Sequence, residues 1–315
     1  MNRRSVLKSL DVSLIDFNDF SYALSPGRWI SPENSLTESI AENGIIHPPA
    51  VKKTTGGSYV IVSGRKRLQV FRSLFPEEQS CFCIIFSETT PEIDIYSYLL
   101  EEIIIRRQLT PVEKGIFLQK ISSVIDEKRI TEKFLSRLGL PRDPIQIKRG
   151  QKLLDLDAPL VKALHQGNLH ESVAQEMLAL SSDDRLAIYE VISTLKLGVN
   201  YQKKLMRICQ ELAGREQKSI GSLLKEDDVQ ETLNHREANP PQKAKNLMSQ
   251  LMRKYKPRSS RAEDEFNHFV SSLRLPKNIS VTHTQSFEDD LLTLAVTASD
   301  KKFLLKILGK IKDAT

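Results

Sequence analysis

Three cations follow a glycine at the end of an apolar strand pattern, in residues 59–67 (YVIVSGRKR). Residues 59–62 predict a strand and residues 65–74 a helix, so Gly64, Arg65, Lys66 and Arg67 lie at a helix start. The free amides of a helix start carry partial positive charge, and guanidinium groups add charge-assisted donors. We interpret this segment as an anion site, most simply for phosphate. The alternative is an ordinary exposed basic helix start.

A second basic pattern lies in residues 131–154. Thr131 is expected to cap a short helix, Gly139 to make a turn, and Asp143 to precede a proline at the first position of the next helix. At about 100° per residue, one face of that helix is apolar or small and the opposite face is basic. The inner face holds Ile147, Gly150, Leu153 and Leu154, and the outer face holds Lys148, Arg149 and Lys152. The layout is typical of a helix-turn-helix whose second helix enters the DNA major groove, although a bundle helix with a solvated basic face is the alternative.

Acidic residues lie between these two patterns, in residues 101–113 (EEIIIRRQLTPVE). Glu101 and Glu102 end one predicted helix, and Glu113 lies in the first turn of the next, which begins at Thr110-Pro111. Carboxylates close to a phosphate-binding arginine cluster are suited to hold magnesium. Taken alone, they are equally well explained as solvated helix charges.

The elements that would position these residues change in type along the chain. Residues 11–108 predict a mixed α/β unit, and amphipathic helices follow one another from residue 111 to residue 213. The expected strands are 12–17, 50–53, 59–62 and 81–86, and the expected helices of the first unit are 35–43, 65–74 and 93–106. The later helices are expected at 111–126, 131–138, 144–155, 158–166, 170–179, 183–195 and 200–213.

The last hundred residues divide again. Residues 215–262 are polar and poorly periodic, with a basic run from 240 to 261, which predicts a flexible basic linker. Residues 263–315 predict a helix, two strands and a helix beginning near Ser299. So small a unit buries little surface alone, which suggests dimerisation. The expected domains are 1–108 and 109–214, then the linker 215–262 and a C-terminal domain 263–315, an α+β multidomain protein.

The composition limits the class of protein. The 315 residues include 46 Lys and Arg against 40 Asp and Glu, a net charge of +6, and 40% are hydrophobic, which excludes a wholly disordered chain. Three cysteines cannot form a disulfide framework, and Cys81 and Cys83 share one face of a predicted strand as buried thiols. Without a secretory signal or a long apolar run, we expect a soluble, reduced, cytoplasmic protein.

Taken together, the order and spacing of these segments resemble the ParB family of chromosome- and plasmid-partition proteins. Residues 36–51 (LTESIAENGIIHPPAV) are similar to the family's helix and nucleotide-contacting turn, with Gly44 and Pro48 at the family's Gly-x-x-x-Pro positions. Residues 63–67 (SGRKR) and 102–113 match two further family segments, and the helix-turn-helix follows at the expected distance. The terminal helix, two strands and helix are similar to the family's dimerisation domain.

The resemblance implies a dimeric protein that binds double-stranded DNA, associates with the nucleoid and works with a partition ATPase. It also implies binding of CTP with Mg²⁺ between the first two domains and closure into a clamp around DNA. The implied nucleotide site is Gly44, Pro48, Gly64, Arg65, Lys66, Arg67, Glu102 and Arg106. The residues expected to contact DNA are Lys148, Arg149, Gln151, Lys152, Lys254, Lys256 and Arg258.

The chain departs from the family pattern at several of these positions. Arg65 stands where the family has Glu, Lys66 replaces an Arg whose planar fork it cannot copy, and Ile103 replaces an Asn. Residues 172–175 read Ser-Val-Ala-Gln where the family has Gly-His-Ala-Arg. These changes predict altered recognition of nucleotide and of the DNA site, and they leave CTP hydrolysis undecided.

The leading hypothesis is therefore a ParB-like DNA-binding protein that acts in segregation, nucleoid organisation or transcription. One alternative is a nucleotide hydrolase or nuclease that uses Glu102 and a metal, although no dense carboxylate cluster is present in the sequence. Another is an adaptor that dimerises through residues 263–315 and binds proteins through its helices.

Overall fold

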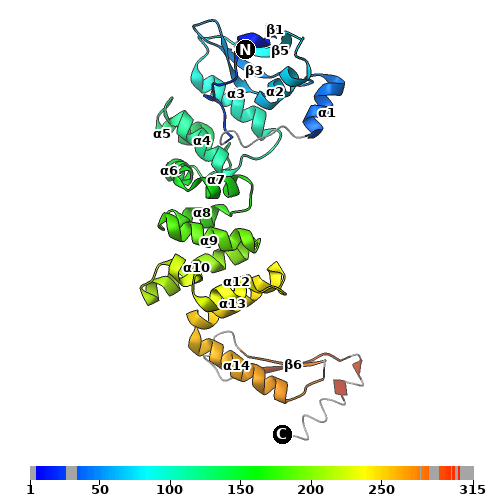
Figure 1. Cartoon of the computed structure of the whole chain (residues 1–315), viewed down its shortest axis with the longest axis vertical. Coiled ribbons are helices and arrows are strands. Elements are labelled where there is room, and N and C mark those ends of the chain that lie inside the picture. Colours follow the sequence, from blue (N-terminus) through cyan, green and yellow to red (C-terminus); the bar gives the residue numbers. More distant parts are fainter. Residues whose placement is uncertain are drawn as a thin grey trace. The chain divides into compact units, whose positions relative to one another are not determined.

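The computed structural model describes residues 5–25, 34–276, 278–283, 291–298, 300–301 and 304–305. The chain divides into two compact units, Met1–Lys203 and Lys204–Thr315, which are described separately. Figure 1 labels their helices and strands.

The first unit begins with a five-stranded mixed sheet. In spatial order the strands are β1 (Ser5–Asp11), β5 (Ser80–Phe86), β3 (Ala50–Lys53), β4 (Tyr59–Ser63) and β2 (Ile15–Asp16). The pairs β1–β5 and β3–β4 are antiparallel, and β5–β3 and β4–β2 are parallel. Helices α1 (Asn34–Asn43), α2 (Arg65–Leu74) and α3 (Glu92–Ile104) accompany it (Figure 1).

The prediction of one strand over residues 12–17 is wrong. The first long strand is β1, and a 3-10 turn over Val12–Leu14 separates it from the short β2. The Asp11 carboxylate accepts a hydrogen bond of 2.8 Å from the Ser13 amide, which turns the chain and ends the strand. Cys81 and Cys83 are buried on one face of β5, as predicted, with 3.6 Å between their sulfur atoms.

Helices then continue to the end of the unit. They are α4 (Pro111–Ser122), α5 (Glu127–Ile130), α6 (Ile145–Lys152), α7 (Ala158–His165), α8 (Glu171–Met177), α9 (Ser182–Thr194) and the start of α10 (Val199–Glu216). The cap expected at Thr131 lies instead at Asp126, whose carboxylate accepts from the Arg129 amide at 2.9 Å. A turn of π-helix over Thr131–Leu135 follows α5 without a break.

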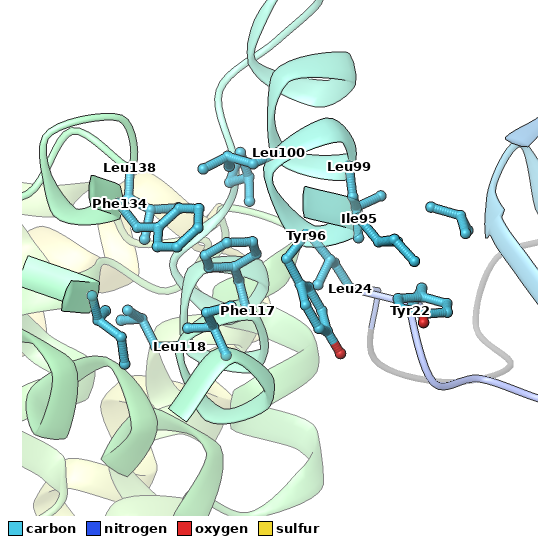
Figure 2. Packing of buried hydrophobic residues seen from close by; sticks show 14 of the residues in the cluster. Tyr22, Leu24, Ile95, Tyr96, Leu99, Leu100, Phe117, Leu118, Phe134 and Leu138 are labelled. Carbon is cyan, nitrogen blue, oxygen red and sulfur yellow. The ribbon is translucent and has the colours of Figure 1, made fainter. Parts of the chain in front are cut away.

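One hydrophobic core joins the sheet domain to the first of these helices. Figure 2 shows Phe117 of α4 between Tyr96 of α3 and Phe134 of the π-helical turn. The ring centroids of Phe117 lie 6.0 Å from Tyr96 and 5.3 Å from Phe134, both in edge-on geometry. The same cluster includes Tyr22 and Leu24, so the sheet domain and α4 are held by shared apolar burial.

The flexible linker expected over residues 215–262 is wrong in the second unit. That segment contains α11 (Ile220–Leu224), α12 (Asp227–Asn234) and α13 (Pro240–Tyr255), and α14 (Pro257–Ser272) begins within it. Asn239 and Gln242 form a complete capping box at the start of α13. The apolar face of α13, with Leu247 and Leu251 fully buried, packs within this unit.

After α14, β6 (Ile279–His283) and β7 (Leu292–Val296) form an antiparallel pair, close to the two predicted strands. Most of the helix predicted after Ser299 lies outside the described residues, so the full helix-strand-strand-helix arrangement is not established. The fold class is otherwise as expected, with an α/β domain first and a mostly helical remainder.

Candidate functional site

Gly64 makes the turn from β4 into α2. It adopts a left-handed conformation, with φ of 82° and ψ of 20°. A Cβ atom at this position would lie 2.8 Å from Pro49 Cβ and 3.0 Å from Arg67 Nη2. Both the backbone conformation and the crowding therefore require glycine. The consequence is that the backbone at the start of α2 passes close to Pro49.

Arg67 connects three segments at this point. Its guanidinium donates to the His47 carbonyl, in the loop after α1, and to Glu102 Oε1 of α3 at 2.9 Å. Arg106 Nη2, one helical turn after Glu102, lies 3.4 Å from the same carboxylate oxygen. The Arg67 and Glu102 side chains are only 13% and 14% exposed, whereas that of Arg106 is 50% exposed. The structure thus assembles a recessed ion pair with a more accessible second cation.

Two buried oxygen atoms in this region have no hydrogen-bond partner among the described residues. They are Ser63 Oγ, immediately before Gly64, and Glu102 Oε2, the second oxygen of the carboxylate that pairs with Arg67. Unsatisfied buried polar atoms are rare in folded proteins, and each requires an explanation such as an ion or a ligand. A cation bound at the carboxylate would satisfy Glu102 Oε2.

Tyr98 is a further residue of this region that sequence reasoning missed. Burial is the main cause that raises its pKa, with an added contribution from Glu102, while Arg67 and Arg106 lower it. Its ring packs edge-on against Phe86, with centroids 5.0 Å apart. The available sequence signal was its position four residues before Glu102, which places both on one side of α3.

Arg65 does not join this cluster. Its guanidinium donates to the Phe17 carbonyl at 2.7 Å and to the Asp19 carbonyl, and it lies 4.3 Å from the centroid of the Phe20 ring. Arg65 therefore fastens the segment after β2 and lies apart from the Arg67–Glu102 pair, so its role as a nucleotide contact stays a prediction.

The other predicted nucleotide residues surround the cluster less closely. Gly44 ends α1 with φ of 65° and leads into the loop that contains Pro48 and His47. Lys66 is half-buried and has no hydrogen bond or ion pair with any described residue. The cluster proper thus consists of Gly64, Arg67, Glu102 and Arg106.

The predicted recognition helix α6 packs closely on α4. A Cβ on Gly115 of α4 would lie 2.5 Å from the Gly150 carbonyl, and one on Gly150 would lie 2.8 Å from Leu118 Cδ1. Ile147 and Leu153 are 1% exposed on this inner side. Lys148, Arg149 and Lys152 are exposed on the outer side, as expected, and present positive charge to solvent.

Two residues predicted to contact DNA are occupied within the protein. Gln151 donates to Ser122 Oγ at 2.9 Å and toward the Leu118 carbonyl at 3.3 Å, which fastens α6 to α4. In the second unit, Lys254 forms ion pairs with Glu226 at 2.6 Å and Asp228 at 2.7 Å. Their contact with DNA stays a prediction, and it would require these internal partners to be exchanged for phosphate or base atoms. Lys256 is exposed, and the side chain of Arg258 lies outside the described part of the chain.

A buried ionic network connects the end of α3 to the helices. Glu113 accepts two hydrogen bonds of 2.6 Å from Arg107 and one of 2.9 Å from the Thr110 amide. Thr110 Oγ1 lies 2.9 Å from His165 Nδ1 of α7. Although burial opposes ionisation, the hydrogen bonds with Arg107 and Thr110 lower the pKa of Glu113. We assign this network a structural role.

The described residues include neither a membrane-spanning helix nor a cluster of metal-ligating side chains. None of their helices has both the length and the apolarity needed to cross a bilayer. They also contain no cluster of three or more His, Cys, Asp or Glu side chains that could ligate a metal ion.

The comparisons with known proteins agree with the motifs found in the sequence. Residues 5–103 match the family model of the ParB N-terminal domain. The chain is 27% identical over 206 residues to a probable chromosome-partitioning protein ParB of Borreliella burgdorferi, an alignment that covers 64% of this chain and 74% of the relative. It is 25% identical over 234 residues to a probable chromosome 1-partitioning protein ParB of Deinococcus radiodurans, covering 74% of this chain and 72% of that one.

Among solved structures, the chain is similar to the C-terminally truncated chromosome-partitioning protein ParB from Caulobacter crescentus complexed with CTP-gamma-S. The sequence identity is 19% and the TM-score is 0.26, over 60% of this chain and 99% of that one.

Proposed function

We propose that this chain, whose residues 5–103 match the ParB N-terminal domain, is a ParB-family protein that binds double-stranded DNA and acts in chromosome or plasmid segregation. The observation that carries the proposal is the exposed basic face of α6, held outward by the close Gly115–Gly150 contact. A helix fixed in this way can enter the major groove as a rigid body. The proposal includes nucleoid association, and regulation of transcription would follow from the same binding.

The test is a measurement of duplex affinity against salt, after a target site has been selected from random duplexes. The double variant K148Q/K152Q should lower the affinity and reduce the slope of log K against log salt by about 0.9 for each phosphate that is no longer neutralised. The control K53Q/K225Q removes two other exposed lysines and should leave both values unchanged. No duplex binding by the wild-type chain at low salt would refute the function.

A second proposal concerns CTP with Mg²⁺ at the Gly64–Arg67–Glu102 cluster. The amides of α2 and the Arg106 guanidinium are suited to bind phosphate oxygens. Glu102 Oε2 fits one position of magnesium, which commonly takes one or two carboxylates together with substrate phosphates. When bound, the cation would neutralise phosphate charge next to the carboxylate. Arg67 would keep Glu102 oriented, and Gly64 would let the backbone approach the phosphates.

Calorimetry with CTP and Mg²⁺ tests this site. Arg106→Ala should weaken CTP binding at least tenfold, whereas Arg129→Ala, at an exposed ion pair elsewhere, should not. Clamp closure predicts CTP-dependent retention on closed DNA and loss from open-ended DNA. Retention of the protein on closed DNA without CTP would contradict the clamp. Release of phosphate from CTP by the wild-type chain, abolished in Glu102→Gln, would show CTP hydrolysis.

The proposal also includes a homodimer formed through the C-terminal segment and a partition ATPase as partner. The described hairpin supports the dimer, because Leu292 and Leu294 of β7 are 52% and 51% exposed. A protein adaptor without DNA affinity is the alternative that would remain if the duplex-binding experiment failed.

A further inference from the structure

An isoleucine lies in the middle of the basic outer face of α6. Ile145 is the first residue of the helix, and its side chain is 55% exposed. At about 100° per residue, Lys148 lies about 60° to one side of it around the helix axis and Arg149 about 40° to the other. Lys152, two turns further along the helix, falls between them. The face that presents positive charge to solvent therefore also presents one large apolar side chain.

The packing of α6 does not account for this isoleucine. Ile147, which is 1% exposed, belongs to the core cluster that includes Phe117 and Leu118 of α4. Because Ile145 and Ile147 are about 200° apart around the axis, their side chains lie on opposite sides of the helix. Single apolar residues are common on protein surfaces, so exposure alone indicates no site. Here, however, the side chain lies among cations on the face that we propose to enter the major groove.

The backbone at the start of α6 is fixed by hydrogen bonds. The Asp143 carboxylate accepts one of 3.0 Å from the Ile145 amide, and the Asp143 carbonyl accepts one of 2.9 Å from the Gln146 amide. Isoleucine is branched at Cβ and has one strongly preferred side-chain rotamer in a helix. Its methyl groups are therefore held in a defined direction, and they lose less conformational entropy on contact with a partner than a long, flexible side chain does.

We propose that Ile145 recognises thymine, through an apolar contact with the C5-methyl group in the major groove of DNA. Residues at the N-terminal end of a recognition helix contact base edges. Thymine is the one standard base with an apolar group in that groove, and apolar side chains are its partners there. The flanking cations Lys148 and Arg149 are suited to phosphate oxygens or to guanine. This inference rests on the proposed DNA-binding function and names a base that α6 requires in its target.

The experiment replaces each thymine of a target duplex, selected from random sequences, by deoxyuridine, one position at a time. Deoxyuridine keeps the hydrogen-bonding groups of thymine and lacks only the C5-methyl group. At one position of the site, the full-length wild-type chain should bind the substituted duplex about fourfold more weakly, which is the effect of one buried methyl group. Ile145→Ala should lower the affinity for the unsubstituted target and should bind the thymine and deoxyuridine duplexes equally well. The control Leu7→Ala truncates an aliphatic side chain that is 56% exposed in β1, and it should keep the wild-type difference.

The outcomes separate this inference from the DNA-binding function. If no deoxyuridine substitution weakens binding by wild type, or if Ile145→Ala keeps the wild-type preference for thymine, the inference is refuted and the DNA-binding function stands. The same holds if wild type binds DNA but the selection yields no preferred sequence. If wild type binds no duplex at low salt, both are refuted. The deoxyuridine measurement on wild type does not depend on how the variant folds, and circular dichroism should show unchanged helix content in Ile145→Ala, because the side chain is exposed.

Discussion

At the scale of single residues, Gly64 has two separate reasons to be glycine, and they can be measured apart. Gly64→Ala combines an unfavourable positive φ with a contact of 2.8 Å to Pro49, whereas Gly57→Ala has a similar φ of 85° and nothing within 4 Å. Gly57→Ala should lower the free energy of unfolding by about 1–2 kcal/mol, because of the backbone conformation alone. Gly64→Ala should cost more, because Pro49 is buried and cannot move away. Urea unfolding measures both, and equal destabilisation would contradict the crowding.

Glu113 gives the fold a specific pH dependence. Its folded-state pKa is lowered, so its contribution to stability is present above its unfolded pKa of about 4.3 and is lost as pH falls through the folded pKa. Glu113→Gln should destabilise the chain by about 1.5–3 kcal/mol at neutral pH, the value of hydrogen bonds to a charged group. Urea unfolding from pH 7 downward should show the difference from wild type shrinking with acidification. A difference that is constant with pH would exclude the ionised pair as its source.

At the scale of elements, two glycines set how closely α4 and α6 cross. Gly115→Ala places a Cβ 2.5 Å from the Gly150 carbonyl, so the helices must separate, at a cost of about 1–3 kcal/mol. Gly214→Ala, within α10 and with nothing within 4 Å, should instead stabilise by about 0.5–1 kcal/mol. Thermal unfolding should therefore shift in opposite directions. Gly115→Ala should also weaken duplex binding, since α6 would be displaced, and unchanged binding would argue against a fixed α6.

The elements also show where sequence reasoning succeeded. Strand and helix patterns with clear periodicity, such as residues 65–74, were placed correctly, and the inner and outer faces of α6 were assigned correctly from spacing alone. The linker prediction was wrong because it followed the polar and basic composition of the segment. The apolar positions Ala244, Leu247, Met248 and Leu251 of α13 recur at helical spacing and are the signal that it overlooked.

Side-chain partners were the least accessible part of the site. The family resemblance grouped Gly64, Arg67, Glu102 and Arg106 in one site, and the structure connects the last three by ion pairs. No spacing rule could show that Arg65 turns to the carbonyls of Phe17 and Asp19, since that depends on the course of a segment 46 to 48 residues away. The same holds for Gln151 and Lys254, which have side chains suited to DNA but partners within the protein.

At the scale of the whole molecule, the exposed apolar face of the β6–β7 hairpin bears on whether two chains form a dimer. An isolated two-stranded hairpin is marginally stable in water, and one face of β6 and β7 carries the apolar pairs Ile279–Val296 and Val281–Leu294 together with Leu292, which lies opposite His283. That face exposes about half of Leu292 and Leu294. A second copy of the chain is the partner that we propose to cover it.

The dimer can be tested with a control on the same strand. L292D/L294D places carboxylates on the apolar face, and burying them in an interface without cationic partners would cost several kcal/mol per charge. Thr293→Asp lies between them and, because side chains alternate along a strand, points to the opposite face. Light scattering should give a dimer mass for wild type and for Thr293→Asp, and a monomer mass for L292D/L294D at the same concentration. Loss of the dimer should lower the affinity of L292D/L294D for a DNA target with two half-sites, because each chain would then bind its half-site alone. A dimer mass for L292D/L294D would show that another surface joins the two copies.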